Sequence, residues 1–211
     1  MKVLFVGMTG HFSLRPLQIL LRAPELEIVG VLVPGQGQPH RIERPPLPLG
    51  MLQTLQLHNI VQLAWSLGIP VFEARSFRNL CTLEPLQPDI IAVACFPRLL
   101  PARFRALARL AAVNVHPSLL PKNRGPDPIG WTISSGERQT GVTIHLLSDK
   151  ADAGDILAQA PLDVPPGTTR NQLEVRCANL GGELLLDVIR QLTAGTANPI
   201  PQDDSQATHH S

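Results

Sequence analysis

The sequence predicts an α/β protein with a doubly wound, mostly parallel sheet, and three observations support this class. Apolar runs as long as buried strands occur at 2–7, 27–33 and 89–94. Leucines at helical spacing alternate with these runs, which is typical of strand–helix–strand units. The chain has 211 residues, 44% of them hydrophobic, so one domain can bury a sizeable core. The expected fold is Rossmann-like.

The first half of the chain alternates strands with helices. Glycine closes the first apolar run, and a leucine-rich helical pattern follows it. The second apolar run leads into a loop rich in proline and glycine at 34–50. The expected elements are a strand at 2–7, a helix at 14–22, a strand at 27–33, a helix at 55–67, a strand at 71–72 and a strand at 89–94.

The second half continues the alternation and ends in a polar segment. A helix is expected at 101–110, a strand ending at residue 116, and another strand at 142–147. A long helix over 168–192 has one apolar face, with Thr168 or Thr169 as its N-cap and Gly195 closing it. The expected organisation is a domain at 1–195 followed by a polar tail at 196–211.

Composition excludes several classes of function. The formal net charge of +1 gives no general electrostatic case for binding nucleic acid. A local basic patch from Arg41, Arg44, Lys122 and Arg124 is an open alternative, with scattered solvated charges the favoured interpretation. Three widely spaced cysteines predict neither a disulfide framework nor a metal site. No stretch has the roughly 20 apolar residues that cross a membrane, so we expect a cytoplasmic protein.

The run Asn114-Val-His116-Pro-Ser-Leu-Leu-Pro carries the first chemical signal. Asn114 and His116 are two residues apart on a predicted strand, so their side chains point to the same side. A carboxamide donor beside an imidazole suits the stabilisation of an oxyanion. The second signal is the run 140–159, in which Asp152 precedes Ala-Gly. A lone histidine after a strand, or a lone aspartate in a turn, is more often structural.

Together, the two runs resemble the catalytic domain of the folate-dependent formyltransferases. That family includes enzymes acting on methionyl-tRNA, glycinamide ribonucleotide and amino sugars. The resemblance implies the formyltransferase fold, 10-formyltetrahydrofolate as co-substrate without a metal, and transfer of a formyl group to a primary amine. It places the catalytic residues at Asn114, His116 and Asp152. Asn114 and His116 would stabilise the oxyanion, and Asp152 would raise the pKa of His116 and relay protons through water.

The resemblance also implies a slot for the pterin ring. It would lie between the segment after the strand at 89–94 and the loop at 149–155. His145 is expected to support the site, and Asp155 to form a turn rather than to act in catalysis. The residues expected to bind the folate are Cys95, Phe96, Leu99, Asp149, Ala151 and Asp155.

The acceptor is less well defined by the sequence. Gly7 and Gly10 do not complete a dinucleotide-binding fingerprint, and the resemblance suggests that the turn at Gly10 approaches an acceptor phosphate. The resemblance makes Arg124 and Trp131 the other expected acceptor contacts, and it implies an amino sugar nucleotide because a tryptophan at this point is common in the amino sugar enzymes. The loop 34–50 either approaches the acceptor or is a plain connector.

Three alternatives to the amino sugar enzyme stay open at this point. Methionyl-tRNA is one, although the low net charge and the apparent lack of a C-terminal barrel domain are unfavourable for it. A hydrolase that delivers water to 10-formyltetrahydrofolate would need the same three residues. A folate-binding relic without activity is the third. The sequence does not predict the oligomeric state.

Overall fold

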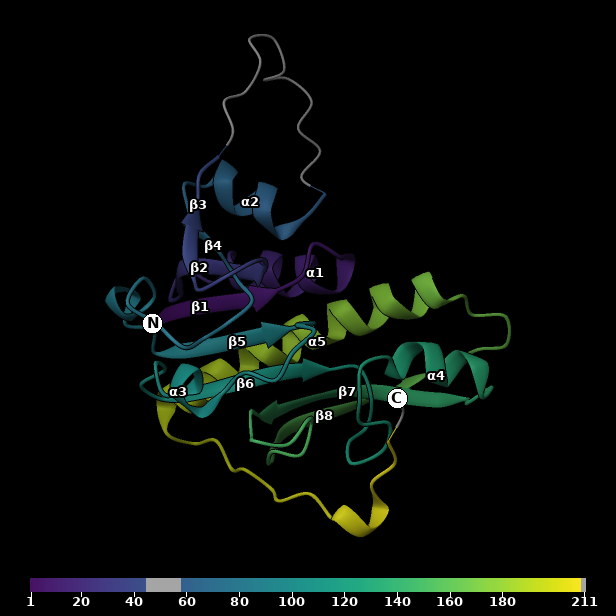
Figure 1. Ribbon diagram of the computed structural model, residues 1–211. Coiled ribbons are helices and arrows are strands. Elements are labelled where there is room, and N and C mark those ends of the chain that lie inside the picture. The colour runs from purple at the N-terminus through teal and green to yellow at the C-terminus, as the bar shows by residue number, and fades with distance from the viewer. Residues whose placement is uncertain (45–57, 210–211) are drawn as a thin grey trace, which may run out of the picture.

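The computed structural model describes residues 1–44 and 58–209, and one eight-stranded sheet organises them (Figure 1). The order across the sheet is β3-β4-β2-β1-β5-β6-β7-β8. The strands β1, β2, β4, β5 and β6 pair in parallel, whereas β3, β7 and β8 join by antiparallel pairing. This arrangement confirms the predicted α/β fold with a mostly parallel sheet. The strands are β1 (Lys2–Gly7), β2 (Glu27–Pro34), β3 (His40–Ile42), β4 (Val71–Ala74), β5 (Ile90–Ala94), β6 (Ala111–His116), β7 (Gln139–Leu146) and β8 (Ile156–Asp163).

The helices differ in length between the two faces of the sheet. The longest, α5, packs beside α1 and against β6, β7 and β8. On the opposite face the apolar side chains pack under shorter segments, including α3 and η1. The helical elements are α1 (His11–Leu20), α2 (Ile60–Ser66), η1 (Glu84–Leu86), α3 (Ala102–Arg105), α4 (Pro128–Ser134), α5 (Arg170–Ala194) and η2 (Asp204–Gln206).

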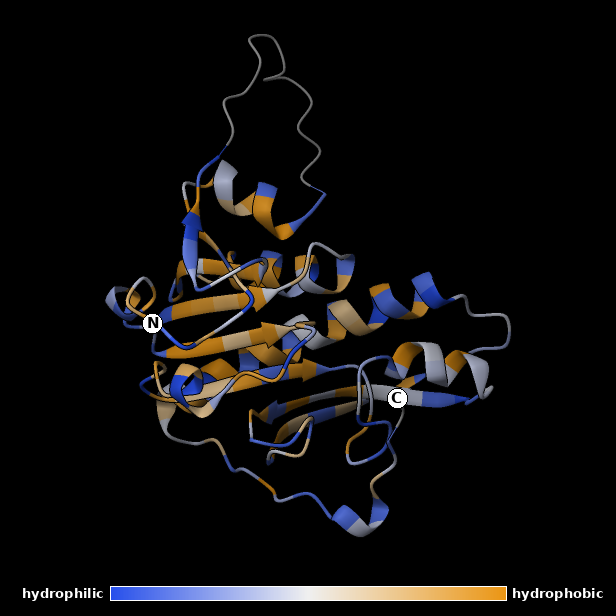
Figure 2. Ribbon diagram, viewed as in Figure 1, coloured by the Kyte–Doolittle hydropathy of each residue, from blue (hydrophilic) through white to orange (hydrophobic). Residues whose placement is uncertain are grey.

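Alternation along the central strands builds a core on each face. Phe5 belongs to the core under α1 and α5, and its neighbour Leu4 belongs to the core on the other face. Both side chains are fully buried, which explains why β1 reads as an unbroken apolar run. Figure 2 shows the same contrast, with hydrophobic central strands and a mostly hydrophilic C-terminal segment.

The direction of chain winding reverses beside β1. The chain runs from β1 outward to β2 and β4, then returns to β5 on the other flank of β1. Such a reversal leaves a crevice at the carboxyl ends of the strands. Ser13 joins the ends of β1 and β5, because its hydroxyl donates to the Ala94 carbonyl at 2.6 Å and accepts from the Met8 amide at 2.9 Å. A Cβ on Gly7 would lie 2.8 Å from the Ser13 Cβ, so glycine is needed there.

Most predicted elements occur, with shifted ends. The helix predicted at 14–22 is α1, which begins earlier, at His11. The helix predicted at 55–67 corresponds to α2, which spans Ile60–Ser66. Residues 55–57 lie outside the described residues. The prediction of a helix over 101–110 was wrong in length, since α3 is one turn. The amides of Arg109 and Leu110 bond instead to the carbonyls of Pro88 and Asp89, which starts β6.

The C-terminal helix matches its predicted signals. Thr169 is the N-cap of α5, and its hydroxyl and the Gln172 side chain form a reciprocal capping box. Gly195 closes the helix with a φ of 68°. Across the described parts of the chain, no helix combines the length and apolar character needed to cross a membrane.

Candidate active site

The end of β6 positions the first two polar side chains of the site. Asn114 lies opposite His145, because β6 and β7 pair in antiparallel register. The Asn114 Nδ2 atom lies 3.1 Å from His145 Nε2. His116, two residues further along β6, is buried and lies edge-on to His145 with 6.2 Å between ring centres. The strand pairing therefore brings together two imidazoles and one carboxamide.

Asp152 completes this cluster from the loop between β7 and β8. Its Oδ1 atom lies 3.5 Å from Asn114 Nδ2, from His116 Nδ1 and from His145 Nε2. Its Oδ2 atom accepts a hydrogen bond from the Gly125 amide at 3.0 Å. The structure thus brings the three predicted catalytic residues together.

Backbone carbonyls define how the two imidazoles face the cluster. His145 Nδ1 lies 2.8 Å from the carbonyl of Leu146, so Nδ1 carries the proton there. Its Nε2 atom is then free to accept from Asn114 when the ring is neutral. His116 Nε2 lies 2.9 Å from the carbonyl of Asn123 and must donate to it, which turns Nδ1 toward Asp152.

The charges in the cluster shift two pKa values. Burial alone would raise the pKa of Asp152. The hydrogen bond that His145 Nε2 donates when that imidazole is protonated, the positive charges of both histidines and the Gly125 amide outweigh burial and lower the pKa to about 2. Burial lowers the pKa of His116 below its usual value, and the opposing charge of Asp152 does not fully offset this. The predicted effect of Asp152 on His116 is therefore present, but burial is the larger effect.

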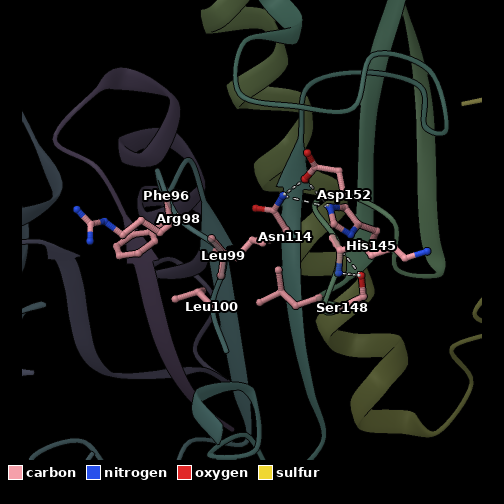
Figure 3. Close-up of a pocket in the computed structure, with 11 residues that line it drawn as sticks. Phe96, Arg98, Leu99, Leu100, Asn114, His145, Ser148 and Asp152 are labelled. Carbon is pink, nitrogen blue, oxygen red and sulfur yellow. Dashed lines mark hydrogen bonds and ion pairs between the residues drawn. The ribbon is translucent and has the colours of Figure 1, made fainter. Parts of the chain in front are cut away.

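A pocket opens beside Asn114, His145 and Asp152 (Figure 3). Phe96, Leu99 and Leu100 stand across from the polar cluster. One side of the pocket is thus mainly apolar, with Arg98 beside Phe96, and the other side carries hydrogen-bonding groups. Its lining residues are Val93, Phe96, Arg98, Leu99, Leu100, Asn114, His145, Leu147, Ser148, Lys150 and Asp152.

The predicted folate-binding residues divide into two groups. Phe96 and Leu99 line the pocket, whereas Cys95, Asp149, Ala151 and Asp155 are not among its lining residues in the described structure. The Asp149 carboxylate is exposed and pairs with Arg105. Cys95 has a φ of 61°, and its Sγ lies 3.7 Å from Met8 Sδ. Folate contacts by these four residues stay predictions.

The predicted acceptor contacts lie in different surroundings. Gly10 is the N-cap of α1, and a Cβ there would meet open space. Trp131 lies on α4 with 44% of its surface exposed. Arg124 is only 4% exposed, and its guanidinium bonds to Gln202 and Asp204 in the C-terminal segment. A contact between Arg124 and an acceptor stays a prediction. Of the loop 34–50, residues 45–50 lie outside the described residues.

The sequence did not mark several of the residues that line the pocket as central to the site. His145 was expected only to support the site, yet it lines the pocket while His116 does not. Its position opposite Asn114 depends on the antiparallel pairing of β6 and β7. The prediction of a mostly parallel sheet did not include this pairing. Arg98 and Lys150 also line the pocket. Among the described residues, no group of three or more histidine, cysteine, aspartate or glutamate side chains could hold a metal ion.

The fold and the site together define a class of protein: a Rossmann-like domain with an asparagine–histidine–aspartate cluster suited to acyl transfer. A family model described as formyl transferase matches residues 62–189. This match spans more than half of the chain. The chain therefore belongs to the formyl transferase family.

Curated relatives share sequence along almost the whole chain. The methionyl-tRNA formyltransferase of Synechococcus sp. (strain JA-3-3Ab) is 37% identical over 99% of this chain, which spans 63% of that relative. The methionyl-tRNA formyltransferase of Syntrophus aciditrophicus is 36% identical over 98% of this chain and 64% of its own length. This chain thus spans a little under two thirds of the length of the relatives it matches.

Solved structures share the fold at lower identity. An N-formyltransferase from Helicobacter canadensis, solved with folinic acid and dTDP-3-aminofucose, has a TM-score of 0.71 and 17% identity over 100% of this chain and 71% of its own. A phosphoribosylglycinamide formyltransferase from Streptococcus pneumoniae has a TM-score of 0.69 and 20% identity over 92% of this chain and 99% of its own. At these identities, the likeness establishes the fold alone.

Proposed function

We propose that this protein transfers the formyl group of 10-formyltetrahydrofolate to a primary amine. The observation that carries the proposal is the pocket in which Asn114, His145 and Asp152 face an apolar wall. Membership of the formyl transferase family supports the reaction class. Related folds solved with folinic acid or 5-N-formyl-THF support a folate as the formyl donor.

The residues present fit such a donor. Phe96, Leu99 and Leu100 provide an apolar wall for a flat ring. Arg98 and Lys150 line the same pocket and supply positive charge for the carboxylates of a folate. When bound, 10-formyltetrahydrofolate supplies a formyl carbonyl whose oxygen gains negative charge as an amine attacks its carbon.

The side chains of the cluster can then take different roles in the reaction. Asn114 Nδ2 donates a hydrogen bond to the oxygen that gains charge. As the Asn114 amide turns to that oxygen, His145 Nε2 becomes free to accept the proton that the attacking amine releases. It returns this proton to N10 as the bond between N10 and the formyl carbon breaks, which releases tetrahydrofolate. Asp152 remains ionised because its pKa is about 2, so its charge stabilises the protonated imidazole. His116 contacts the same Asp152 oxygen but does not line the pocket, and in this proposal it supports the cluster.

Methionyl-tRNA is the acceptor that the relatives favour. Curated proteins 36–38% identical over nearly all of this chain carry that name. An amino sugar nucleotide is the second candidate, because the exposed Trp131 on α4 follows the pattern expected of the sugar enzymes. The sequence alone favoured the sugar, and the relatives shift the balance toward the tRNA.

Separate assays of each acceptor would test the proposal. Pure protein and 10-formyltetrahydrofolate are mixed with charged initiator tRNA, with nucleotide-linked amino sugars or with glycinamide ribonucleotide, and tetrahydrofolate release is measured. We expect release to depend on methionyl-tRNA. Release that depends on an amino sugar would select the second candidate. Equal release without any acceptor would contradict transfer and identify a hydrolase, and no release in any mixture would contradict the catalytic proposal.

A further inference from the structure

The segment after α5 lies along both loops of the site. It leaves the end of α5 and returns toward α4 and β7 (Figure 1). Ile200 exchanges two backbone hydrogen bonds of 2.8 Å with Ile156 at the start of β8. Thr208 accepts from the Asn123 amide at its Oγ1 (2.7 Å) and from the Arg124 amide at its carbonyl (2.9 Å). One segment thus contacts the start of β8 and the loop after β6.

Gln202, between these two anchor points, uses both ends of its amide. Nε2 donates to the carbonyls of Asp152 at 2.8 Å and Gly154 at 2.7 Å. Oε1 accepts from Arg124 Nε at 3.1 Å and Nη2 at 2.7 Å. Carbonyls only accept and a guanidinium only donates, so the reversed amide would lose all four bonds. Gln202 therefore joins the two loops in one orientation.

The backbone that Gln202 contacts at Asp152 has an unfavourable conformation. Asp152 has a φ of 51°, a left-handed conformation that costs free energy for residues other than glycine, although less for aspartate than for most. The turn is tight, because a Cβ on Gly154 would collide with the carbonyl of Leu146. Such a conformation persists only where surrounding contacts impose it. The two bonds from Gln202 hold the carbonyls on either side of Ala153.

The same glutamine also reaches the carboxylate of Asp152 through the other loop. Asp152 Oδ2 accepts from the amide of Gly125, which follows Arg124 directly. Arg124 is buried, and its guanidinium bonds to Gln202. Gln202 therefore acts on the backbone of Asp152 directly and on its carboxylate through Arg124 and Gly125.

We propose that Gln202 is a positioning residue that holds Asp152 in register with Asn114 and the two histidines. The positioning claim is geometric, and its effect on turnover rests on the proposed formyl transfer. Gln202 touches neither the pocket nor the reacting atoms. It acts through Asp152, so its loss misplaces a group that the reaction needs.

The test replaces the donor end of Gln202 without shortening the side chain. Gln202→Glu keeps an acceptor for Arg124 but turns a carboxylate toward two carbonyls, and Gln202→Met removes both functions without adding charge. Gln206→Glu is the matched control, because Gln206 lies exposed in the same segment and bonds to Asp203. We expect kcat per folded molecule to fall about a hundredfold in both Gln202 variants, while KM for the folate changes by less than about threefold. Gln206→Glu should match the wild type.

Hydrogen exchange measures the geometric claim without any turnover. Peptides covering 147–156 should exchange faster in both Gln202 variants, while peptides from β1 and β5 keep wild-type rates. Wild-type exchange in 147–156 would overturn the proposal, and so would an unchanged kcat per folded molecule. Absence of turnover in the wild type would refute the proposed function, and the exchange rates would still decide the role of Gln202.

Discussion

At the scale of single residues, the two histidines of the site have different surroundings. His145 lines the pocket and shares a hydrogen bond with Asn114. His116 points one nitrogen at the Asn123 carbonyl and the other at Asp152, and it is not among the residues that line the pocket. This geometry favours His145 for proton transfer and His116 for support of the cluster.

His145→Ala should lower kcat by about a hundredfold or more, because a positioned acid–base group contributes on the order of 10² to 10⁴ in rate. The measurement is steady-state formyl transfer at saturating folate and acceptor. His58→Ala, an exposed histidine just before α2, is the control and should keep wild-type kcat. An unchanged kcat in His145→Ala would return the proton transfer to His116.

The charge of Asp152 makes the free energy of unfolding depend on pH. Its pKa is about 2 instead of 3.8, so the unfolded chain binds this proton more readily than the folded protein. The resulting stability is present above about pH 4 and lost as pH falls toward 2. The lowered pKa of His116 acts in the same direction at higher pH, with stability declining as pH falls through its usual value of 6.5.

Asp152→Asn should remove the loss of folding stability that occurs between about pH 4 and pH 2. We expect the wild type to lose about 2 kcal/mol more unfolding free energy between pH 5 and pH 2.5 than the variant. Urea unfolding at a series of pH values measures this difference. Asp163→Asn, which removes an exposed carboxylate from β8, is the matched variant. Parallel pH profiles for Asp152→Asn and the wild type would contradict the assignment.

At the scale of elements, two glycines let α5 approach the rest of the core closely. A Cβ on Gly181 would lie 2.5 Å from the Val115 Cγ1 atom, between Asn114 and His116 on β6. A Cβ on Gly182 would lie 3.0 Å from the Pro16 Cα atom on α1. These glycines trade helix propensity for close packing, and that packing supports the strand that carries the site.

Gly181→Ala should therefore destabilise the protein although alanine favours helix. We expect a loss of about 1–3 kcal/mol from overpacking against a stiff valine. Thermal or urea unfolding measures it, with Asn179→Ala on the exposed side of α5 as the control. A gain in stability for Gly181→Ala would show that α5 can shift away from β6.

The sequence predicted the elements whose signal is local. Buried parallel strands such as β1 and β5 are unbroken apolar runs, and Thr169 and Gly195 mark the ends of α5 by capping chemistry. It did not predict β8, which joins the sheet only through antiparallel pairing with β7. The more buried and the exposed side chains of β8 alternate along the strand, and residues typical of turns flank it. No continuous apolar run therefore marks this strand in the sequence.

At the scale of the whole molecule, the site depends on contacts between distant segments. The family resemblance identified Asn114, His116 and Asp152, and the fold places Asn114 Nδ2 and His116 Nδ1 each 3.5 Å from Asp152 Oδ1. The role of the polar segment 196–209 could not be predicted from the sequence. Arg124 and Gln202 are separated by 78 positions, and only the folded chain shows that their side chains meet.

One measurement tests the central claim most directly: the fate of a labelled formyl group from 10-formyltetrahydrofolate, recovered either on the amine of methionyl-tRNA or as free formate. We predict recovery on the amine with the wild type. Asn114→Ala should slow it about a hundred- to a thousandfold, since one oxyanion donor is lost. Asn171→Ala, an exposed asparagine on α5, should transfer the label at the wild-type rate. Label recovered only as formate, or an undiminished rate in Asn114→Ala, would contradict the account.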